Sequence, residues 1–73
     1  MKTIYADFNN IGLEGFIRLT CVGTTCDLEA AGVVLVEGLQ LTVSDGDLIA
    51  DIVVRKSAEG GWGGEFIGEI RDC

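Results

Sequence analysis

The segment spanning residues 38–53 constrains the fold of this chain more than any other stretch. Two runs of alternating apolar and polar residues flank the dipeptide Asp45-Gly46. Asp-Gly favours a two-residue type I′ turn, because that turn needs positive φ angles and glycine adopts them freely. This turn places Ser44 opposite Asp47 and puts three apolar pairs on one face of the hairpin: Val43 with Leu48, Leu41 with Ala50, and Leu39 with Ile52. The segment therefore predicts a β-hairpin with one buried face.

The opposite face of this hairpin is expected to face solvent. It carries two further pairs: Gln40 with Asp51, and Thr42 with Ile49. Asp45 and Asp47 flank the glycine at the tip, and two such carboxylates resemble an acid–base pair or a weak Ca²⁺ site. They lack the ligand spacing of an EF-hand loop, so turn formation is the favoured interpretation.

Composition supports a small β-rich domain. The chain has 73 residues, of which 48% are hydrophobic, and it contains 11 glycines but no proline. Such a composition suits short strands joined by tight turns. A chain of this size buries only about 60% of its unfolded surface, so self-association would add to its stability. We expect a single domain over residues 1–73.

Three further segments show the alternation of strands, namely residues 2–8, 13–21 and 65–71. The first two are expected to form an antiparallel pair, with the inward-facing residues Ile4, Ala6, Phe8, Leu13, Ile17, Leu19 and Cys21. Together with the hairpin they predict an all-β, mainly antiparallel barrel of five strands. Residues 33–36 are apolar on both faces, which predicts a segment that is sandwiched in the fold or contacts another chain.

Residues 23–32 interrupt the alternation and predict one or two helical turns. Thr24 precedes Asp27 by three residues, which resembles a capping box with aspartate in place of glutamate. Asp27 and Glu29 suit the positive end of a helix dipole, and Gly32 suits the left-handed position that ends a helix. We expect this helix to plug an open end of the sheet, because it is too short to be stable alone.

The order of these elements resembles small bacterial β-barrels of the Src-homology-3 type, and more closely an uncharacterised family of short bacterial proteins in that class. The resemblance extends from about residue 4 to 67 and is carried by Gly15, Ile17, Arg18, Leu19, Gly23, Thr24, Asp27, Leu28, Leu35, Gly38, Leu39, Leu41 and Trp62. It implies a five-stranded Src-homology-3-like barrel with one short helical turn. It implies no particular function.

Residues 27–32 are also similar to the Asp-x-Ser-x-x-Gly motif of PilZ domains, which are β-barrels that bind cyclic dinucleotides. PilZ domains combine this motif with an upstream Arg-x-x-x-Arg, whereas here Arg18 has no partner arginine and Glu29 replaces the serine. A ligand with two phosphates needs the missing positive charge and is repelled by Glu29. The partial motif leaves small-molecule or nucleotide binding as a weak alternative to the protein-interaction role described below.

The net charge of −7 argues against nucleic acid or an anionic membrane as a partner, since both are bound by clustered Lys and Arg. No apolar run reaches the roughly 18 residues of a membrane span, and the first residues do not resemble a signal peptide. We therefore expect a cytoplasmic protein. The three cysteines do not indicate a disulfide framework: Cys21 is expected inside the fold and Cys73 as a free exposed thiol.

Side chains suited to catalysis or metal binding are scarce. The chain has no histidine, and Ser44 and Ser57 have no evident activating base. Three thiols without histidine do not complete a four-ligand zinc site. We therefore expect neither an enzyme nor a bound cofactor or metal.

Apolar residues on the expected solvent faces mark a candidate interface. They are Phe16, Ile49, Val53, Trp62 and Ile67, joined by Val34 or Val36. Exposed apolar patches on small domains mark contact surfaces, and a two-fold dimer would bury this one. Trp62 lies among four glycines and is either a binding anchor on a mobile loop or a residue that caps the core. The sequence thus favours a non-catalytic protein-interaction or assembly module that binds a protein partner or itself.

Overall fold

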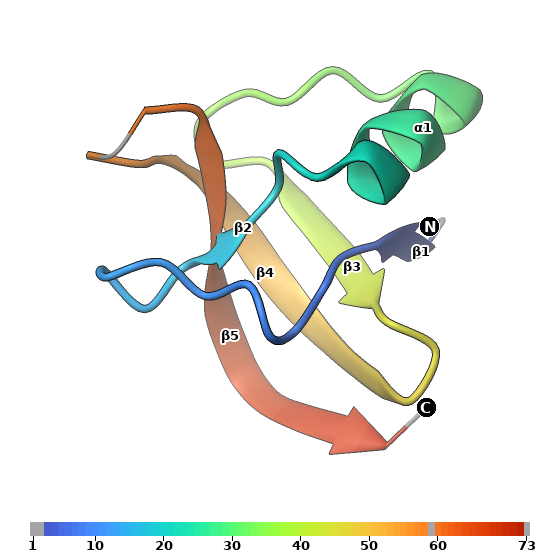
Figure 1. Cartoon of the computed structure of the whole chain (residues 1–73), viewed down its shortest axis with the longest axis vertical. Helices are drawn as coiled ribbons and strands as arrows, with labels where there is room; N and C mark the ends of the chain where they lie inside the picture. The colour runs from blue at the N-terminus through green and yellow to red at the C-terminus, as the bar shows by residue number, and fades with distance from the viewer. Residues whose placement is uncertain (1–2, 59, 73) are drawn as a thin grey trace.

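The computed structural model describes residues 3–58 and 60–72. In these residues the chain forms β1 (Thr3–Tyr5), β2 (Ile17–Arg18), α1 (Val22–Ala31), β3 (Gln40–Ser44), β4 (Leu48–Lys56) and β5 (Trp62–Asp72). The strands make one curled sheet in the order β1-β3-β4-β5-β2, and α1 contacts β1 (Figure 1). This sheet is a half-barrel, so the prediction of an all-β, barrel-like fold is confirmed.

The β3–β4 hairpin has the predicted faces but not the predicted register. Ser44 pairs with Ile49 and Val43 with Ala50, so each residue of β3 lies opposite a residue two positions further along β4 than expected. A shift of two residues leaves every side chain on its own face, because the side-chain period of a strand is two. The expected inner positions Leu41, Val43, Ala50 and Ile52 are therefore buried, although Val53, which was expected to face solvent, is buried as well.

The register differs because the turn is wider than two residues. The backbone N–H of Asp45 donates to the backbone oxygen of Leu48 (3.2 Å), and Gly46 has a positive φ of 100°. The Oδ1 atom of Asp45 accepts the backbone N–H groups of Asp47 (2.9 Å) and Leu48 (2.8 Å). A two-residue turn would pair Asp47 with Ser44 and break these bonds. The prediction that Asp45 serves the turn is confirmed, with its side chain selecting the turn length.

β1 pairs in parallel with β3, so the predicted antiparallel pair of β1 with β2 is wrong and the sheet is mixed. Ile4 lies beside Val43, and both are almost completely buried. β2 is short because the chain before it folds back, with the backbone N–H of Arg18 donating to the backbone oxygen of Asn10 (2.9 Å). Leu13 lies in this fold-back and is 95% exposed, although the alternation placed it inside.

α1 has ten residues and begins at Val22, earlier than expected. Cys21 was predicted to point inward from a strand, but it is the N-cap residue, and its Sγ atom lies 2.9 Å from Oγ1 of Thr24. The predicted capping box is wrong, because Thr24 and Asp27 bond to β1 instead of to the first turn of the helix. The predicted end is confirmed, since Gly32 has a φ of 68° and terminates the helix.

The hydrophobic core lies inside the half-barrel. Its buried members are Ile4, Ala6, Ile17, Leu19, Leu28, Leu41, Val43, Ile52 and Val54. Residues 33–36 form part of the loop between α1 and β3 rather than a strand, with Val33 and Leu35 packed against the core. Among the described residues, no helix has the length and apolar character needed to cross a membrane.

β2 meets β5 at two adjacent buried glycines, Gly63 and Gly64. A Cβ atom at Gly64 would collide with the side chain of Ile52, and one at Gly63 would lie 2.9 Å from Cβ of Phe16. These glycines therefore allow close packing between strands, which is a different role from giving a loop mobility. Trp62 is the first residue of β5 and is half-buried against the core.

Candidate interaction surface

Side chains of α1 cover the outer edge of β1 at Tyr5. The hydroxyl of Thr24 donates to the backbone oxygen of Tyr5 (2.7 Å), and the backbone N–H of Tyr5 donates to Oδ2 of Asp27 (2.9 Å). Gly23 permits this approach, because a Cβ atom there would lie 2.8 Å from the ring of Tyr5. Both groups through which Tyr5 would pair with a further strand are thereby occupied.

The outer edge of β5 is open over most of its length. β2 pairs with β5 at Gly63 and Gly64. Over residues 65–72, no backbone of the described part of the chain pairs with β5 on the side away from β4, and β5 curves away from β2 there (Figure 1). Ile67 and Ile70 belong to this stretch and are 37% and 47% exposed. The edge therefore presents backbone hydrogen-bonding groups and apolar side chains together.

Charged residues and a bulge accompany the open edge. Its charged side chains are Glu65, Glu69, Arg71 and Asp72. The pairing of β4 with β5 shifts between Ile49 and Asp51, and Gly68 on β5 has a φ of 78°. Charges and bulges are the usual means by which proteins prevent indiscriminate pairing at an edge. The β5 edge therefore carries two features that oppose indiscriminate strand pairing.

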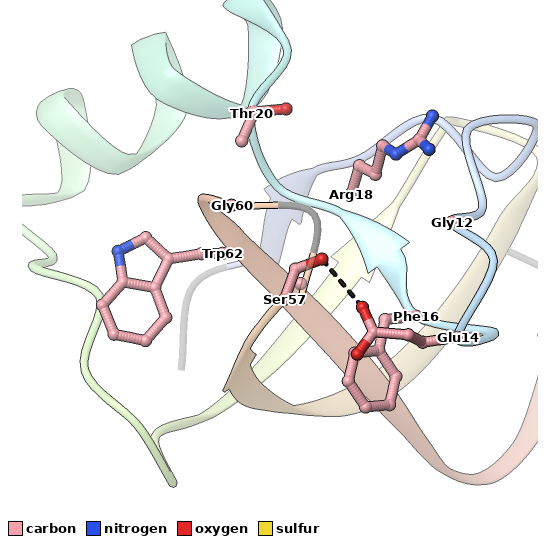
Figure 2. Close-up of a pocket in the computed structure, with 9 residues that line it drawn as sticks. Gly12, Glu14, Phe16, Arg18, Thr20, Ser57, Gly60 and Trp62 are labelled. Carbon is pink, nitrogen blue, oxygen red and sulfur yellow. Dashed lines mark hydrogen bonds between the residues drawn. The ribbon is translucent and has the colours of Figure 1, made fainter.

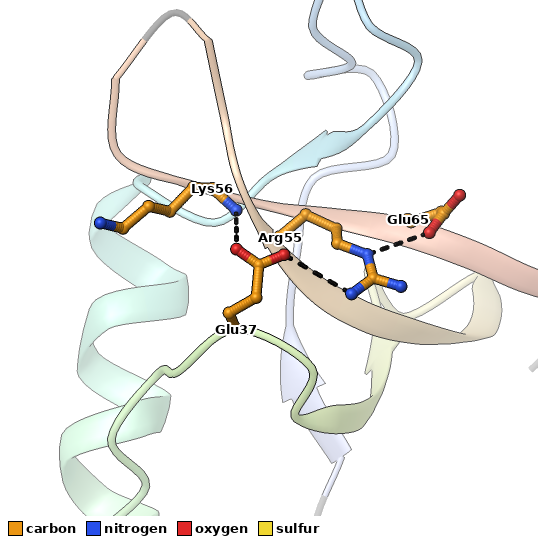
Figure 3. A network of polar contacts seen from close by, with 4 residues as sticks. All are labelled: Glu37, Arg55, Lys56 and Glu65. Carbon is orange, nitrogen blue, oxygen red and sulfur yellow. Dashed lines mark hydrogen bonds and ion pairs between the residues drawn. The ribbon is translucent and has the colours of Figure 1, made fainter.

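Two ion pairs hold the edge charges against β4. Arg55 binds Glu65 through Nε (3.2 Å) and Glu37 through Nη1 (3.5 Å), as Figure 3 shows. An Nη2 atom of Arg71 lies 3.9 Å from Oδ2 of Asp51. Pairs this exposed contribute at most about 1 kcal/mol to stability. Their main effect is to fix the positions of the Glu65 and Arg71 side chains beside β4.

The five apolar residues predicted as an interface do not form one exposed patch. Val53 is 9% exposed, and Phe16 and Ile49 are half-buried. Trp62 packs against the core, as in the second of its two predicted roles. Of the five, Ile67 alone is exposed, and it lies opposite Asp51 in the β4–β5 pair.

The sequence did not single out Ile70 or the open edge. The run from residue 13 to 21 alternates as regularly as a long strand, and in the register of β2 a strand of that length would cover β5 as far as Gly68. In the structure its first residues fold back instead, which leaves residues 65–68 of β5 without a strand on that side. Val34 and Val36 are exposed as expected, but they lie on the loop between α1 and β3, apart from the β5 edge.

A hollow of about 220 Å³ lies between the loop before β2 and the β4–β5 turn (Figure 2). At its wall, Oε1 of Glu14 accepts the hydroxyl of Ser57 (2.8 Å) and the backbone N–H of Ala58 (3.1 Å). Arg18 also lines the hollow and donates to Oδ1 of Asn10 (3.1 Å). One carboxylate thus offsets the one arginine, and the lining has no surplus positive charge for a phosphate.

Other side chains singled out in the sequence serve local structure. The backbone N–H groups of Leu48 and Asp47 lower the pKa of the Asp45 carboxyl from its ordinary value, because they stabilise the charged form. Cys21 and Cys26 are free thiols, and Cys73 lies outside the described residues. Within residues 3–58 and 60–72, no three potential metal ligands gather at one place.

The chain matches no protein-family model, no curated protein and no solved structure. The resemblance to bacterial barrels of the Src-homology-3 type therefore stays a prediction. The half-barrel and its open β5 edge are the features from which a function can be inferred.

Proposed function

We propose that the protein is a non-catalytic protein-interaction or assembly module that binds an extended protein segment along the outer edge of β5. One observation carries this proposal: among the described residues, the edge from Glu65 to Asp72 has no pairing partner. Such an edge presents a row of N–H and C=O groups that a strand of a partner satisfies. In this mode of recognition the backbone bonds supply affinity and the side chains supply specificity.

The side chains along the edge favour a protein as the partner. Ile67 and Ile70 offer exposed apolar contacts, and the neighbouring charges are of both signs. The net charge of −7 disfavours nucleic acid and anionic membranes, because both are polyanionic. The bacterial and cytoplasmic setting expected from the sequence belongs to the same proposal.

Selection of binding peptides from a displayed library tests the proposal. Peptides whose binding shifts the amide resonances of residues 65–72 would support it. The variant Ile70→Lys adds a charge to the edge and is expected to weaken such binding about tenfold. The matched control Val34→Lys adds the same charge to an exposed residue away from the edge, and it is expected to leave binding unchanged. Peptides that bind elsewhere, or that bind Ile70→Lys as tightly as the wild type, contradict the proposal.

A further inference from the structure

We infer that the segment occupying the β5 edge is β5 of a second copy of this chain, antiparallel to the first across a two-fold axis at Gly68. This inference rests on the proposed function, because it names the partner of the same edge. Three features of the edge support it: the direction of its backbone groups, the order of its charges and the position of its apolar residues.

The backbone groups of alternate residues face the open edge. The backbone N–H of Leu19 donates to the backbone oxygen of Trp62 (3.1 Å), and Ile17 pairs with Gly64. Alternation along the strand then directs the groups of Phe66 to the same side, beyond the end of β2. In an antiparallel pair, a residue whose backbone groups point towards the partner strand lies opposite a residue whose backbone groups also point towards it. A two-fold axis therefore passes through a residue of β5, not between two residues.

Charge selects among the possible axes. An axis at Ile67 would place Glu65 beside Glu69 of the second copy, and an axis at Glu69 would place that residue beside its own equivalent. An axis at Gly68 places Glu65 beside Arg71 of the second copy, and symmetry repeats this pair. Like charges directly opposite each other destabilise a sheet, whereas opposite charges stabilise it.

An axis at Ile70 also pairs opposite charges, because it places Glu69 beside Arg71 of the second copy. That arrangement leaves residues 65–67 unpaired, although their edge is open. The axis at Gly68 pairs residues 65–71 and so uses more of the open edge. The two arrangements differ in whether Glu65 takes part, which makes this residue the one to change.

The ion pairs within each chain extend the charge pairing across the axis. Arg71 lies 3.9 Å from Asp51, and Arg55 lies 3.2 Å from Glu65. With the axis at Gly68, the charges alternate in sign along one row: Asp51 and Arg71 of one copy, then Glu65 and Arg55 of the second copy. Arg71 and Glu65 thus each have an opposite charge on both sides, which is the complementarity that fixes register at an interface.

The same register covers apolar residues of the edge. It places Phe66 beside Ile70 of the second copy, next to the contact between the rings of Phe66 and Phe8 (centroids 5.9 Å apart). Gly68, with its φ of 78°, interrupts the regular strand at the axis. The pairing therefore consists of two equivalent short segments, residues 65–67 of each copy with 69–71 of the other, and no side chain lies on the axis between them.

Two charge reversals test this register. Glu65→Arg and Arg71→Glu each place like charges opposite one another, so each variant alone is expected to dimerise at least tenfold more weakly than the wild type. An equal mixture of the two variants restores both opposite-charge pairs, and it is expected to form a heterodimer at least tenfold tighter than either homodimer. Sedimentation equilibrium between about 10 µM and about 1 mM measures the dissociation constants, and native mass spectrometry identifies the heterodimer.

The control is Glu37→Arg, which reverses a charge that also binds Arg55 but belongs to the loop before β3. It is expected to dimerise like the wild type. The side chains of Glu65 and Arg71 are 50% and 51% exposed, so both reversals are compatible with folding, which thermal melting by circular dichroism verifies.

Three outcomes overturn the inference: a wild type that stays monomeric to about 1 mM, a Glu65→Arg variant that dimerises like the wild type, or a mixture no tighter than its components. A monomeric wild type that still binds peptides along residues 65–72 would contradict the dimer and leave the proposed function intact. A monomeric wild type that binds no peptide there would contradict the dimer and the proposed function.

Discussion

The edges of β1 and β5 meet the same physical problem in different ways. At β1, Thr24 and Asp27 of α1 occupy the outward backbone groups of Tyr5. At β5, residues 65–72 leave theirs open within the described chain and surround them with charges and a bulge. Unprotected edges are a liability in solution, and proteins cover them or make them selective. This chain covers the edge of β1 at Tyr5, whereas along residues 65–72 it leaves the edge of β5 open and lined with charges.

β5 itself consists of two parts that meet between Gly64 and Glu65. Its first residues, Trp62 to Gly64, pack against β2 and the core, while residues 65–72 are exposed apart from Phe66, which is half-buried. Changes in the first part are therefore expected to affect stability, and changes in the second part to affect association. The four predictions below concern the start of β5, the edge of β1, the hairpin turn and the charges of the β5 edge, in order of expected effect.

Gly64→Ala is expected to have the largest effect on stability. The added methyl group would meet the side chains of Ile52 and Ile17 in the core, and overpacking of this kind costs about 3 kcal/mol. Gly63→Ala is also expected to be destabilising, because its methyl group would lie 2.9 Å from Cβ of Phe16, an atom that cannot move without its backbone. Urea unfolding measures both variants, and a loss below about 0.5 kcal/mol in either would contradict this account of the β2–β5 contact.

Thr24→Val is expected to open the covered edge. The variant keeps the shape of the side chain but removes the hydroxyl that donates to Tyr5, which costs about 1–2 kcal/mol of unfolding free energy. Thr25→Val removes a hydroxyl on the exposed side of the same helix and is expected to cost less than about 0.5 kcal/mol. Faster exchange of the Tyr5 amide in Thr24→Val alone would place the loss at the edge of β1. Similar losses of unfolding free energy in Thr24→Val and Thr25→Val would contradict the prediction.

Asp45→Ala is expected to weaken the hairpin turn in a pH-dependent way without changing association. The folded state lowers the pKa of Asp45 below its ordinary value of 3.8, so the carboxylate stabilises the fold above that pH. This contribution is lost as the pH falls through the lower folded pKa. The stability difference between wild type and variant, measured by urea unfolding, should be constant near neutral pH and shrink below pH 3.8. A difference that persists unchanged in acid would contradict it.

Glu37→Gln and Glu65→Gln are expected to have the smallest effects on stability, below about 0.5 kcal/mol each, because both carboxylates form exposed pairs with Arg55. They should differ in association, since only Glu65 lies on the β5 edge. Parallel sedimentation measurements are expected to show weaker dimerisation for Glu65→Gln and no change for Glu37→Gln. Identical behaviour of the two variants would place the contact elsewhere.

The faces of the hairpin could be predicted from the sequence, whereas its register could not. Alternation determines which residues of β3 and β4 point inward, and it is unaffected by a shift of two positions. The register depends on the turn, and the turn depends on two bonds from the Asp45 side chain to the backbone. The dipeptide Asp-Gly predicts a turn but not the number of residues in it, because that number depends on which backbone N–H groups the aspartate side chain binds.

Long-range contacts explain the remaining errors. The spacing of Thr24 and Asp27 places both on one face of a helix, and the sequence does not reveal that this face meets β1 instead of capping the helix. The glycines after Trp62 read as a flexible loop, although they are where two strands and the core approach one another. The open edge of β5 was not predicted for the same reason, since it depends on where the chain before β2 folds back.

The bonds between Tyr5 and α1 have a consequence for the order in which the chain folds. β3, β4 and β5 are consecutive in sequence and joined by short turns, so they can pair early with little loss of chain entropy. β1 has three residues, pairs with β3 across a long separation, and needs Thr24 and Asp27 of a formed α1 to complete its bonds. We therefore expect β1 to join the sheet after β3, β4 and β5 have paired, and to leave it readily in a local opening.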